Sequence, residues 1–290
     1  MELIKKIGKK INDYGVLVMF SHTIFSLSFA LISMLLAGNG KLNFRVIFWI
    51  LVAFMSARTG ANALNRVIDA EIDAKNPRTA TRQLPQGLMN KKEILIFVVI
   101  CFAIMVFAAW QLNTICFILS PIALFLMTIY SYTKRFTWMC HLVLGITSAA
   151  APVGAWLAVT GKISLIPLAM GAANTLWVAG FDIIYGAQDY DFDTKNGIHS
   201  IPARFGVKNA LHISSVFHVL AVIFLLMVGL LAPQLGIIYY GGLLINMVLF
   251  VIQHRLVKPD NLTNVKIASY SINQVISIVF LVTGLLDCLI

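Results

Sequence analysis

Long apolar stretches alternate with short polar segments along almost the whole chain. Nine of these stretches are long enough, as helices, to cross a hydrocarbon core of about 30 Å. Turn-forming residues such as Gly38-Asn39-Gly40, Pro85, Gly161 and Pro233 separate several of them. The predicted spans are 15–38, 44–68, 94–111, 114–133, 138–159, 165–187, 209–232, 235–254 and 267–287.

Composition agrees with this pattern. The 290 residues are 59% hydrophobic and 12% charged, with a mean hydropathy of +0.87, whereas soluble domains carry about 25% charged residues. The sequence therefore predicts an all-α, polytopic membrane protein with a single transmembrane domain over residues 1–290. The first apolar stretch is long and lacks a small-residue cleavage site, so we expect it to be a span and not a cleaved signal. The four cysteines lack metal-ligand spacing and are interpreted as packing residues.

The excess of basic residues indicates orientation in a membrane. With the N-terminus placed in the cytoplasm, 18 of the 22 Lys and Arg residues fall on the cytoplasmic side and three on the outer side. Arg58 lies within a span. The positive-inside rule accounts for this distribution, so the net charge of +10 requires no nucleic-acid partner. We predict a multi-pass protein of the plasma membrane with its C-terminus outside.

Acidic residues gather in two stretches at cytoplasmic helix ends, about 120 residues apart. At about 100° per residue, the first stretch places five polar residues on one helical arc of about 80°. The second places four on a similar arc. Glu71 and Asp191 point to roughly the opposite sides and are interpreted as solvated charges. The first arc comprises Arg58, Asn62, Asn65, Asp69 and Asp73, and the second comprises Asp182, Tyr185, Asp189 and Asp193.

Converging carboxylates repel one another unless a cation neutralises them. Hard oxygen ligands suit Mg²⁺, which binds one or two carboxylates together with waters and substrate phosphates. The expected metal ligands are Asp69, Asp73, Asp189, Asp193 and the Asn65 amide. Lys and Arg residues flank both stretches, and carboxylate-bound Mg²⁺ rimmed by such bases is typical of diphosphate binding. For any one of these bases, membrane topology alone is an alternative explanation. A diphosphate site that opens into a membrane bundle favours an amphiphilic substrate such as an isoprenyl diphosphate.

The chain resembles the UbiA superfamily of membrane aromatic prenyltransferases over nearly its whole length. Five segments carry the resemblance. They are Asn65-Arg-x-x-Asp69-x-x-x-Asp73, Asn76-Pro-Arg78, Arg82-x-Leu-Pro-x-Gly87, Tyr130-Ser-x-Thr-Lys134-Arg-Phe, and Asp182-x-x-Tyr185-x-x-Gln188-Asp189-x-x-x-Asp193-x-x-x-Gly197-x-x-Ser200-x-Pro202. The resemblance implies a nine-helix bundle with a cytoplasm-facing active site. It also implies Mg²⁺-dependent transfer of a polyprenyl group from a polyprenyl diphosphate to a hydroxylated aromatic acid in quinone biosynthesis.

Within the superfamily the chain looks like the 4-hydroxybenzoate polyprenyltransferase branch. The segments from Ala149 to Trp156 and from Trp177 to Asp182 look closest to a menaquinone-pathway subgroup. The first span carries Phe20-Ser-His22 where ubiquinone-type enzymes tend to have Arg and Lys-Pro. This departure favours an acceptor such as a dihydroxynaphthoate over 4-hydroxybenzoate.

Roles follow for individual residues. Asp69, Asp73, Asp189, Asp193, Asp182 and Tyr185 are the expected catalytic residues, and Asn65, Arg58, Asn62, Arg66, Arg78, Lys134 and Lys195 the expected substrate-binding residues. Asp182 and Tyr185 would orient the phenol or take its proton, or they form an interhelical hydrogen bond. Arg58 would pair with the acceptor carboxylate, or it forms an internal salt bridge, for instance to Asp182. His22 is a further acceptor contact or a packing residue.

Two other classes compete with this interpretation. Charged residues in spans also mark ion pathways, as in transporters, but we find no inverted repeat with interrupted helices. A phospholipid-type phosphotransferase would also combine metal and diphosphate, but its compact Asp-Gly and Ala-Arg signature is absent from the sequence. A UbiA-type enzyme with a different acceptor remains the nearest alternative.

Overall fold

The computed structural model describes residues 14, 15, 17, 24–41 and 43–290. Regular structure in this part of the chain is helical, apart from one isolated bridge between Lys258 and Asn261. The elements are α2 (Ile24–Ala37), α3 (Phe44–Lys75), α4 (Lys91–Leu112), α5 (Thr114–Thr133), α6 (Cys140–Thr160), α7 (Leu165–Gly186), η2 (Ala187–Asp189), α8 (Tyr190–Asn196), α9 (Ile201–Leu231), α10 (Ile237–Leu256), η3 (Ile267–Ser271) and α11 (Ile272–Leu289).

Eight helices in the described ranges are long and apolar enough to cross a membrane, and α2 is a shorter apolar helix. The prediction of an all-α, polytopic membrane protein is therefore confirmed. Predicted span 114–133 coincides with α5, and the other spans differ from the helices mainly at their ends. Within the first predicted span, residues 16 and 18–23 lie outside the described residues, and His22 is among them.

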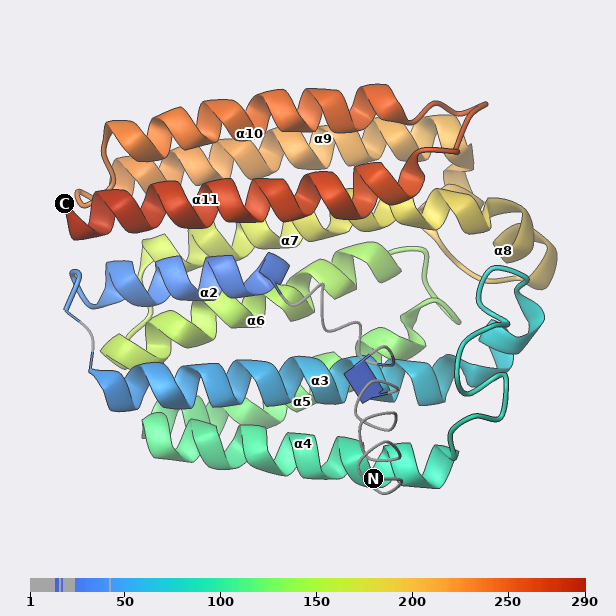
Figure 1. The fold of residues 1–290 in the computed structure, drawn as a ribbon, viewed down its shortest axis with the longest axis horizontal. Helices are drawn as coiled ribbons and strands as arrows, with labels where there is room; N and C mark the ends of the chain where they lie inside the picture. The colour runs from blue at the N-terminus through green and yellow to red at the C-terminus, as the bar shows by residue number, and fades with distance from the viewer. Residues whose placement is uncertain (1–13, 16, 18–23, 42) are drawn as a thin grey trace, which may run out of the picture.

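The helices run side by side in three groups (Figure 1). One side consists of α3, α4 and α5, the opposite side of α9, α10 and α11, and α2, α6 and α7 lie between them. The connection that follows α3 lies at the same end of the bundle as α8, and the C-terminus lies at the other end. Both acidic stretches therefore meet at one end.

Small residues let the central helices approach closely. A Cβ added to Gly145 in α6 would lie 2.2 Å from the carbonyl oxygen of Thr175 in α7. A Cβ added to Gly180 in α7 would lie 2.4 Å from the His218 ring of α9. Such close backbone contacts at small residues are the usual packing mode of membrane helices, where burial of apolar surface from water contributes little.

An aromatic cluster fixes α2, α7 and α11 relative to one another. The Phe29 ring stacks on Trp177 and on Phe280, with ring centroids 5.4 Å and 4.5 Å apart. The buried Trp177 Nε1–H donates a 2.7 Å hydrogen bond to the Asn273 side-chain oxygen. Because an unpaired indole N–H would be costly in this core, the bond also sets the register of α7 against α11.

Helix α3 continues about two turns beyond the predicted apolar span, to Lys75. It ends at Asn76, which precedes Pro77 and has an extended backbone with φ −87° and ψ 118°. Proline disfavours helical conformation in the residue before it. Asp69 and Asp73 thus lie on regular helix, as the predicted arc requires. The span limit of 68 was too short because hydropathy marks where apolar residues stop, not where the helix stops.

The second acidic stretch is less regular than predicted. Helix α7 ends at Gly186, and the 3₁₀ turn η2 separates it from α8. A 3₁₀ turn has about 3.0 residues per turn instead of 3.6, so residues beyond η2 are rotated relative to an unbroken helix. The prediction that Asp182 and Asp193 share one continuous helical arc was therefore wrong in its geometry, although both residues line the same cavity.

Candidate active site

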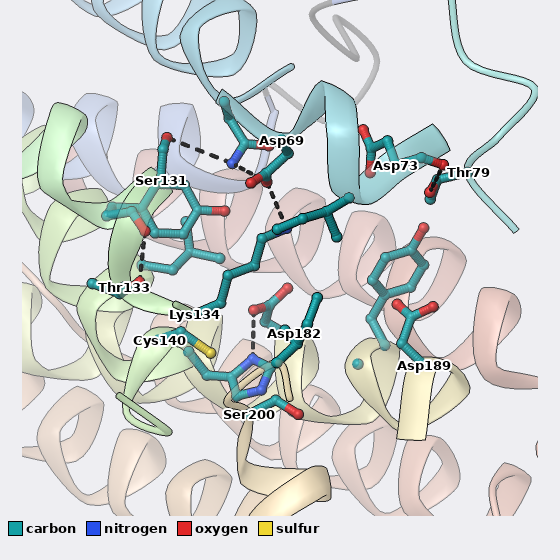
Figure 2. Close-up of a pocket in the computed structure, with 18 of the residues that line it drawn as sticks. Asp69, Asp73, Thr79, Ser131, Thr133, Lys134, Cys140, Asp182, Asp189 and Ser200 are labelled. Atoms are coloured by element: carbon teal, nitrogen blue, oxygen red, sulfur yellow. Dashed lines mark hydrogen bonds and ion pairs between the residues drawn. The ribbon is translucent and has the colours of Figure 1, made fainter. Parts of the chain in front are cut away.

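A polar cavity of about 290 Å³ opens at the end of the bundle where the two acidic stretches meet. Helices α3, α5, α6 and α7, the segment after α3, and η2 with α8 contribute to its wall. In Figure 2, Asp69 and Asp73 project from α3 toward Asp182 and Asp189, with the Lys134 side chain extending between the two groups. The lining includes five carboxylates and five Lys or Arg residues, namely Asp69, Asp73, Asp182, Asp189, Asp193, Arg58, Arg66, Arg78, Arg82 and Lys134.

Asp69 is buried and held by two bases and an amide. Its Oδ2 lies 2.6 Å from Lys134 Nζ and accepts a 2.9 Å hydrogen bond from Asn65, one turn earlier on α3. Its Oδ1 lies 3.2 Å from an Arg135 nitrogen. Arg135 also donates to the carbonyl oxygens of Ser131 and Ile68, so it ties the end of α5 to α3.

Asp73 is paired with the segment that follows its own helix. One Arg82 nitrogen donates to both carboxylate oxygens at 2.7 Å. The Thr79 hydroxyl donates to the Asp73 backbone carbonyl at 3.0 Å. Residues 76–90 therefore fold back over the end of α3, which brings their bases to the cavity.

Asp189 forms a bidentate ion pair with Arg78. The Arg78 nitrogens lie 2.9 Å from Oδ1 and 2.5 Å from Oδ2, and Asn76 donates to Oδ1 at 2.8 Å. Arg78 also donates to the Tyr185 hydroxyl and lies over the Tyr185 ring, 4.7 Å from its centroid. Burial alone would lower the pKa of Arg78, but the hydrogen bond and negative charge of Asp189 raise it above its ordinary value. Arg78 is therefore a permanent cation at the junction of the two motifs.

The remaining two carboxylates have weaker partners. Asp193 is buried and accepts a 2.9 Å hydrogen bond from Ser200, which also caps the start of α9. Asp182 is 28% exposed, and its Oδ2 lies 2.7 Å from Nδ1 of His141, which is buried near the start of α6. The dashed line at Asp182 in Figure 2 marks this contact.

A second, mainly apolar cavity of about 380 Å³ adjoins the first. It lies among α2, α3, α4, α5 and α6. Arg58, Asn62 and Tyr130 line both cavities. The site thus combines a charged cavity at the end of the bundle with an apolar cavity inside the bundle. Arg58 lies where the two cavities meet.

Nearly all residues predicted from the sequence line the polar cavity, including Asn65, Asn62, Arg66 and Tyr185. Lys195 is the exception, because it is exposed on α8 and does not line the cavity. Glu71 and Asp191 are exposed, as expected. Asp182 contacts His141, and the salt bridge that the sequence suggested between Arg58 and Asp182 stays a prediction.

Several residues at the site were given no role from the sequence. Tyr130, His141 and Ser131 line the cavity, but Tyr130 and Ser131 entered only as part of a quoted motif. A single His at the start of a span carries no spacing signal, so only the packing of α6 against α7 reveals His141.

Comparison with known proteins supports a specific relationship. Residues 26–276 match the model of the UbiA prenyltransferase family. The chain is 31% identical over 226 residues to the 4-hydroxybenzoate octaprenyltransferase of Vibrio cholerae, which covers 78% of this chain and 79% of that protein. It is 32% identical over 213 residues to the enzyme of that name from Citrobacter koseri, covering 72% and 73%.

Solved structures agree with these matches. A UbiA homologue from Aeropyrum pernix K1 superimposes with a TM-score of 0.83 at 32% identity, covering 92% of this chain and 98% of that one. A UbiA homologue from Archaeoglobus fulgidus bound to DMAPP and Mg²⁺ has a TM-score of 0.75 at 20% identity, covering 95% and 99%. At that lower identity the likeness concerns the fold.

Proposed function

This chain belongs to the UbiA prenyltransferase family, and from that premise we propose that it transfers a polyprenyl group from a polyprenyl diphosphate to a hydroxylated aromatic acid. The chain is a multi-pass membrane enzyme of the prenyltransferase class. The observation that carries the proposal is the junction of two cavities, one lined by paired carboxylates and bases and one mainly apolar. A substrate with a diphosphate head and a hydrocarbon tail matches both compartments.

The donor set of the polar cavity fits Mg²⁺. Two acidic motifs supply hard carboxylate oxygens, and Mg²⁺ commonly takes one or two carboxylates together with substrate phosphates. Among the described residues no three His, Cys, Asp or Glu side chains form a ready-made metal cluster, so phosphate oxygens would complete the coordination. We propose Asp69, Asp73, Asp189 and Asp193 as the metal ligands, with help from Asn65. When bound, the metal supplies positive charge that stabilises the diphosphate leaving group. The related structure from Archaeoglobus fulgidus contains Mg²⁺ together with a prenyl diphosphate.

The ion pairs of the site suggest how the bases contribute. Lys134, Arg82 and Arg78 each contact a carboxylate proposed to bind metal. Once those carboxylates are otherwise neutralised, the three bases are free to turn to the diphosphate. Cations around the departing oxygens favour cleavage of the allylic carbon–oxygen bond because they stabilise the charge that develops there. Arg66 lines the same cavity and adds to this positive rim.

The aromatic acid is proposed to lie where the two cavities meet. Arg58 and Asn62 lie on α3 deeper than Asp69, and both line the two cavities. Arg58 is the base best placed to pair with the acceptor carboxylate. The allylic carbon of the donor would then lie between the diphosphate and the electron-rich ring, with its tail in the apolar cavity.

The acceptor is proposed to be 4-hydroxybenzoate or a dihydroxynaphthoate, and the pathway quinone biosynthesis. The curated relatives named above are 4-hydroxybenzoate octaprenyltransferases at about 30% identity. The segments near Trp156 and Trp177 favour the naphthoate alternative. We further propose that the cavity faces the cytoplasm, because the basic residues concentrate at this end, and that residues 1–290 form one domain.

A product screen tests the proposal. Purified protein is supplied with Mg²⁺, a set of prenyl diphosphates of different lengths and a set of hydroxylated aromatic acids, and the lipid extract is analysed by mass spectrometry. The proposal predicts a prenylated aromatic acid from at least one pair, with release of diphosphate. If the enzyme acts on another acceptor, none of the aromatic acids will be prenylated. The prenyl diphosphate will still be consumed when a different nucleophile is supplied.

A further inference from the structure

The contact between His141 and Asp182 differs from every other carboxylate contact described in the polar cavity. Asp69, Asp73 and Asp189 are paired with Lys or Arg, and Asp193 is bonded to a serine hydroxyl. A carboxylate beside a permanent positive charge is a poor proton acceptor, because that charge favours its ionised form. Histidine, unlike Lys or Arg, also exists as a neutral side chain that still donates one hydrogen bond.

His141 is held in place by Asp182 and by the backbone of Gly186. Its Nδ1 lies 2.7 Å from Asp182 Oδ2, and the ring is buried against the bare backbone of Gly186, where an added Cβ would lie 2.9 Å from Cε1. Its Nε2 is buried and has no hydrogen-bond partner among the described residues. Because a carboxylate can only accept, Nδ1 carries the proton that joins the pair. The histidine therefore fixes one oxygen of Asp182 and leaves the other side of the carboxylate toward the cavity, consistent with its 28% exposure.

We propose that Asp182 is the base that takes the proton released by the aromatic acceptor, and that His141 is the residue that positions it. This inference rests on the proposed prenyl transfer. In that reaction a ring carbon bonds to the allylic carbon, and the electron pair of the breaking carbon–oxygen bond leaves with the diphosphate. The same ring carbon then loses its hydrogen as a proton. The carbon–hydrogen pair restores the aromatic ring, and the proton passes to the Asp182 carboxylate, so no further reactant is needed.

The position of Asp182 suits this role. It lies on α7 two turns before Asp189, so it is deeper in the bundle than Asp189 and Asp193, which are proposed for the metal. A carboxylate suffices as base, because the ring cation that forms on prenylation is a strong acid compared with the starting phenol. His141 supplies the Nδ1 hydrogen bond that keeps the carboxylate oriented.

The test compares His141→Leu, which removes the donor, with His141→Asn, whose amide nitrogen can occupy the place of Nδ1. For His141→Leu we expect kcat to fall roughly 10²-fold, the scale of lost general-base catalysis, with little change in KM for the diphosphate. Deuterium at the reacting ring position should then slow turnover, whereas the wild-type enzyme should show no such effect. His141→Asn should recover most of kcat and abolish the isotope effect.

A second variant guards against loss of folding. Gly186→Ala keeps His141 but pushes its ring, and it should show the same isotope effect with a smaller loss of kcat. The inference is overturned if His141→Leu turns over within threefold of wild type, or if the slowed variants show no isotope effect. Failure of the proposed function is distinct from both outcomes, because the wild-type enzyme would then prenylate none of the aromatic acids.

Discussion

Arg78 and Asp189 lie 111 positions apart in the sequence and form a two-pronged ion pair, with nitrogen–oxygen distances of 2.9 Å and 2.5 Å. This pair joins the segment after α3 to the junction of α7 and α8. Arg78, which follows the first acidic motif, therefore links that motif to Asp189 of the second. The carboxylates and bases of the site are therefore already paired with one another. In the proposed function, these internal ion pairs are exchanged for contacts with a diphosphate.

Replacing Arg78 by Lys should not preserve activity. Lysine keeps the charge but cannot form the two parallel contacts to Asp189 or stack on Tyr185. We expect kcat/KM for the prenyl diphosphate to fall roughly 10²-fold in both Arg78→Lys and Arg78→Met, on the scale of removing one preorganised electrostatic group. Steady-state kinetics with varied diphosphate measure this. Near-wild-type kinetics in Arg78→Lys would show that charge alone matters at this position.

Lys134 and Lys195 form a matched pair of substitutions. Lys134 contacts the buried Asp69 inside the cavity, whereas Lys195 is exposed and outside its lining. Lys134→Met should lower kcat/KM by roughly 10²-fold, and Lys195→Met should leave it within twofold. A comparable loss in both variants would indicate that general surface charge, not the cavity contact, governs diphosphate binding.

Arg58 should discriminate between the two substrates. If it pairs with the acceptor carboxylate, Arg58→Met removes a charge-assisted contact worth about 1.5–3 kcal/mol. The KM for the aromatic acid should then rise roughly 10- to 100-fold, while the KM for the diphosphate changes little. Separate titration of each substrate gives both values, and an equal rise in the two would contradict the assigned role.

Gly145 and Gly154 allow a stability test within one helix. A Cβ at Gly145 would lie 2.2 Å from the Thr175 carbonyl oxygen, but a Cβ at Gly154 meets nothing within 4 Å. Gly145→Ala should destabilise by about 1–3 kcal/mol or more through overpacking of α6 against α7. Gly154→Ala should be neutral or stabilise by up to about 1 kcal/mol through helix propensity. Thermal unfolding in detergent compares the two, and equal midpoints would show that α6 and α7 separate easily.

The sequence predicted the fold well because a membrane restricts which secondary structure a spanning segment can adopt. Apolar stretches near 20 residues must be helices there, so the spans from 94 onward were located within a few residues, except that α9 begins at Ile201 and not near the predicted start of 209. Helix periodicity also placed Arg58, Asn62, Asn65, Asp69 and Asp73 on one face, and all five line the polar cavity. The continuation of α3 to Lys75 escaped hydropathy because those residues are polar.

Tertiary contacts account for what the sequence did not predict. The 3₁₀ turn at Ala187–Asp189 breaks the second arc, and no residue pattern there signals it. His141 reaches Asp182 only because α6 packs beside α7 at Gly186. Lys195 was grouped with the diphosphate contacts through its nearness in sequence to Asp193, but it points away from the cavity because neighbouring helical residues face different directions.

Dependence of product formation on Mg²⁺ is the most direct test of the central claim. Turnover of a prenyl diphosphate with an aromatic acid is followed by mass spectrometry in Mg²⁺, after addition of EDTA, and after Mg²⁺ is restored in excess. The same series is run with Asp69→Ala. We predict that prenylated aromatic acid forms with Mg²⁺, disappears on chelation, returns when Mg²⁺ is restored, and is absent in the variant. Product formation that survives chelation, or that persists in Asp69→Ala, would contradict a metal-bound diphosphate at the two acidic motifs.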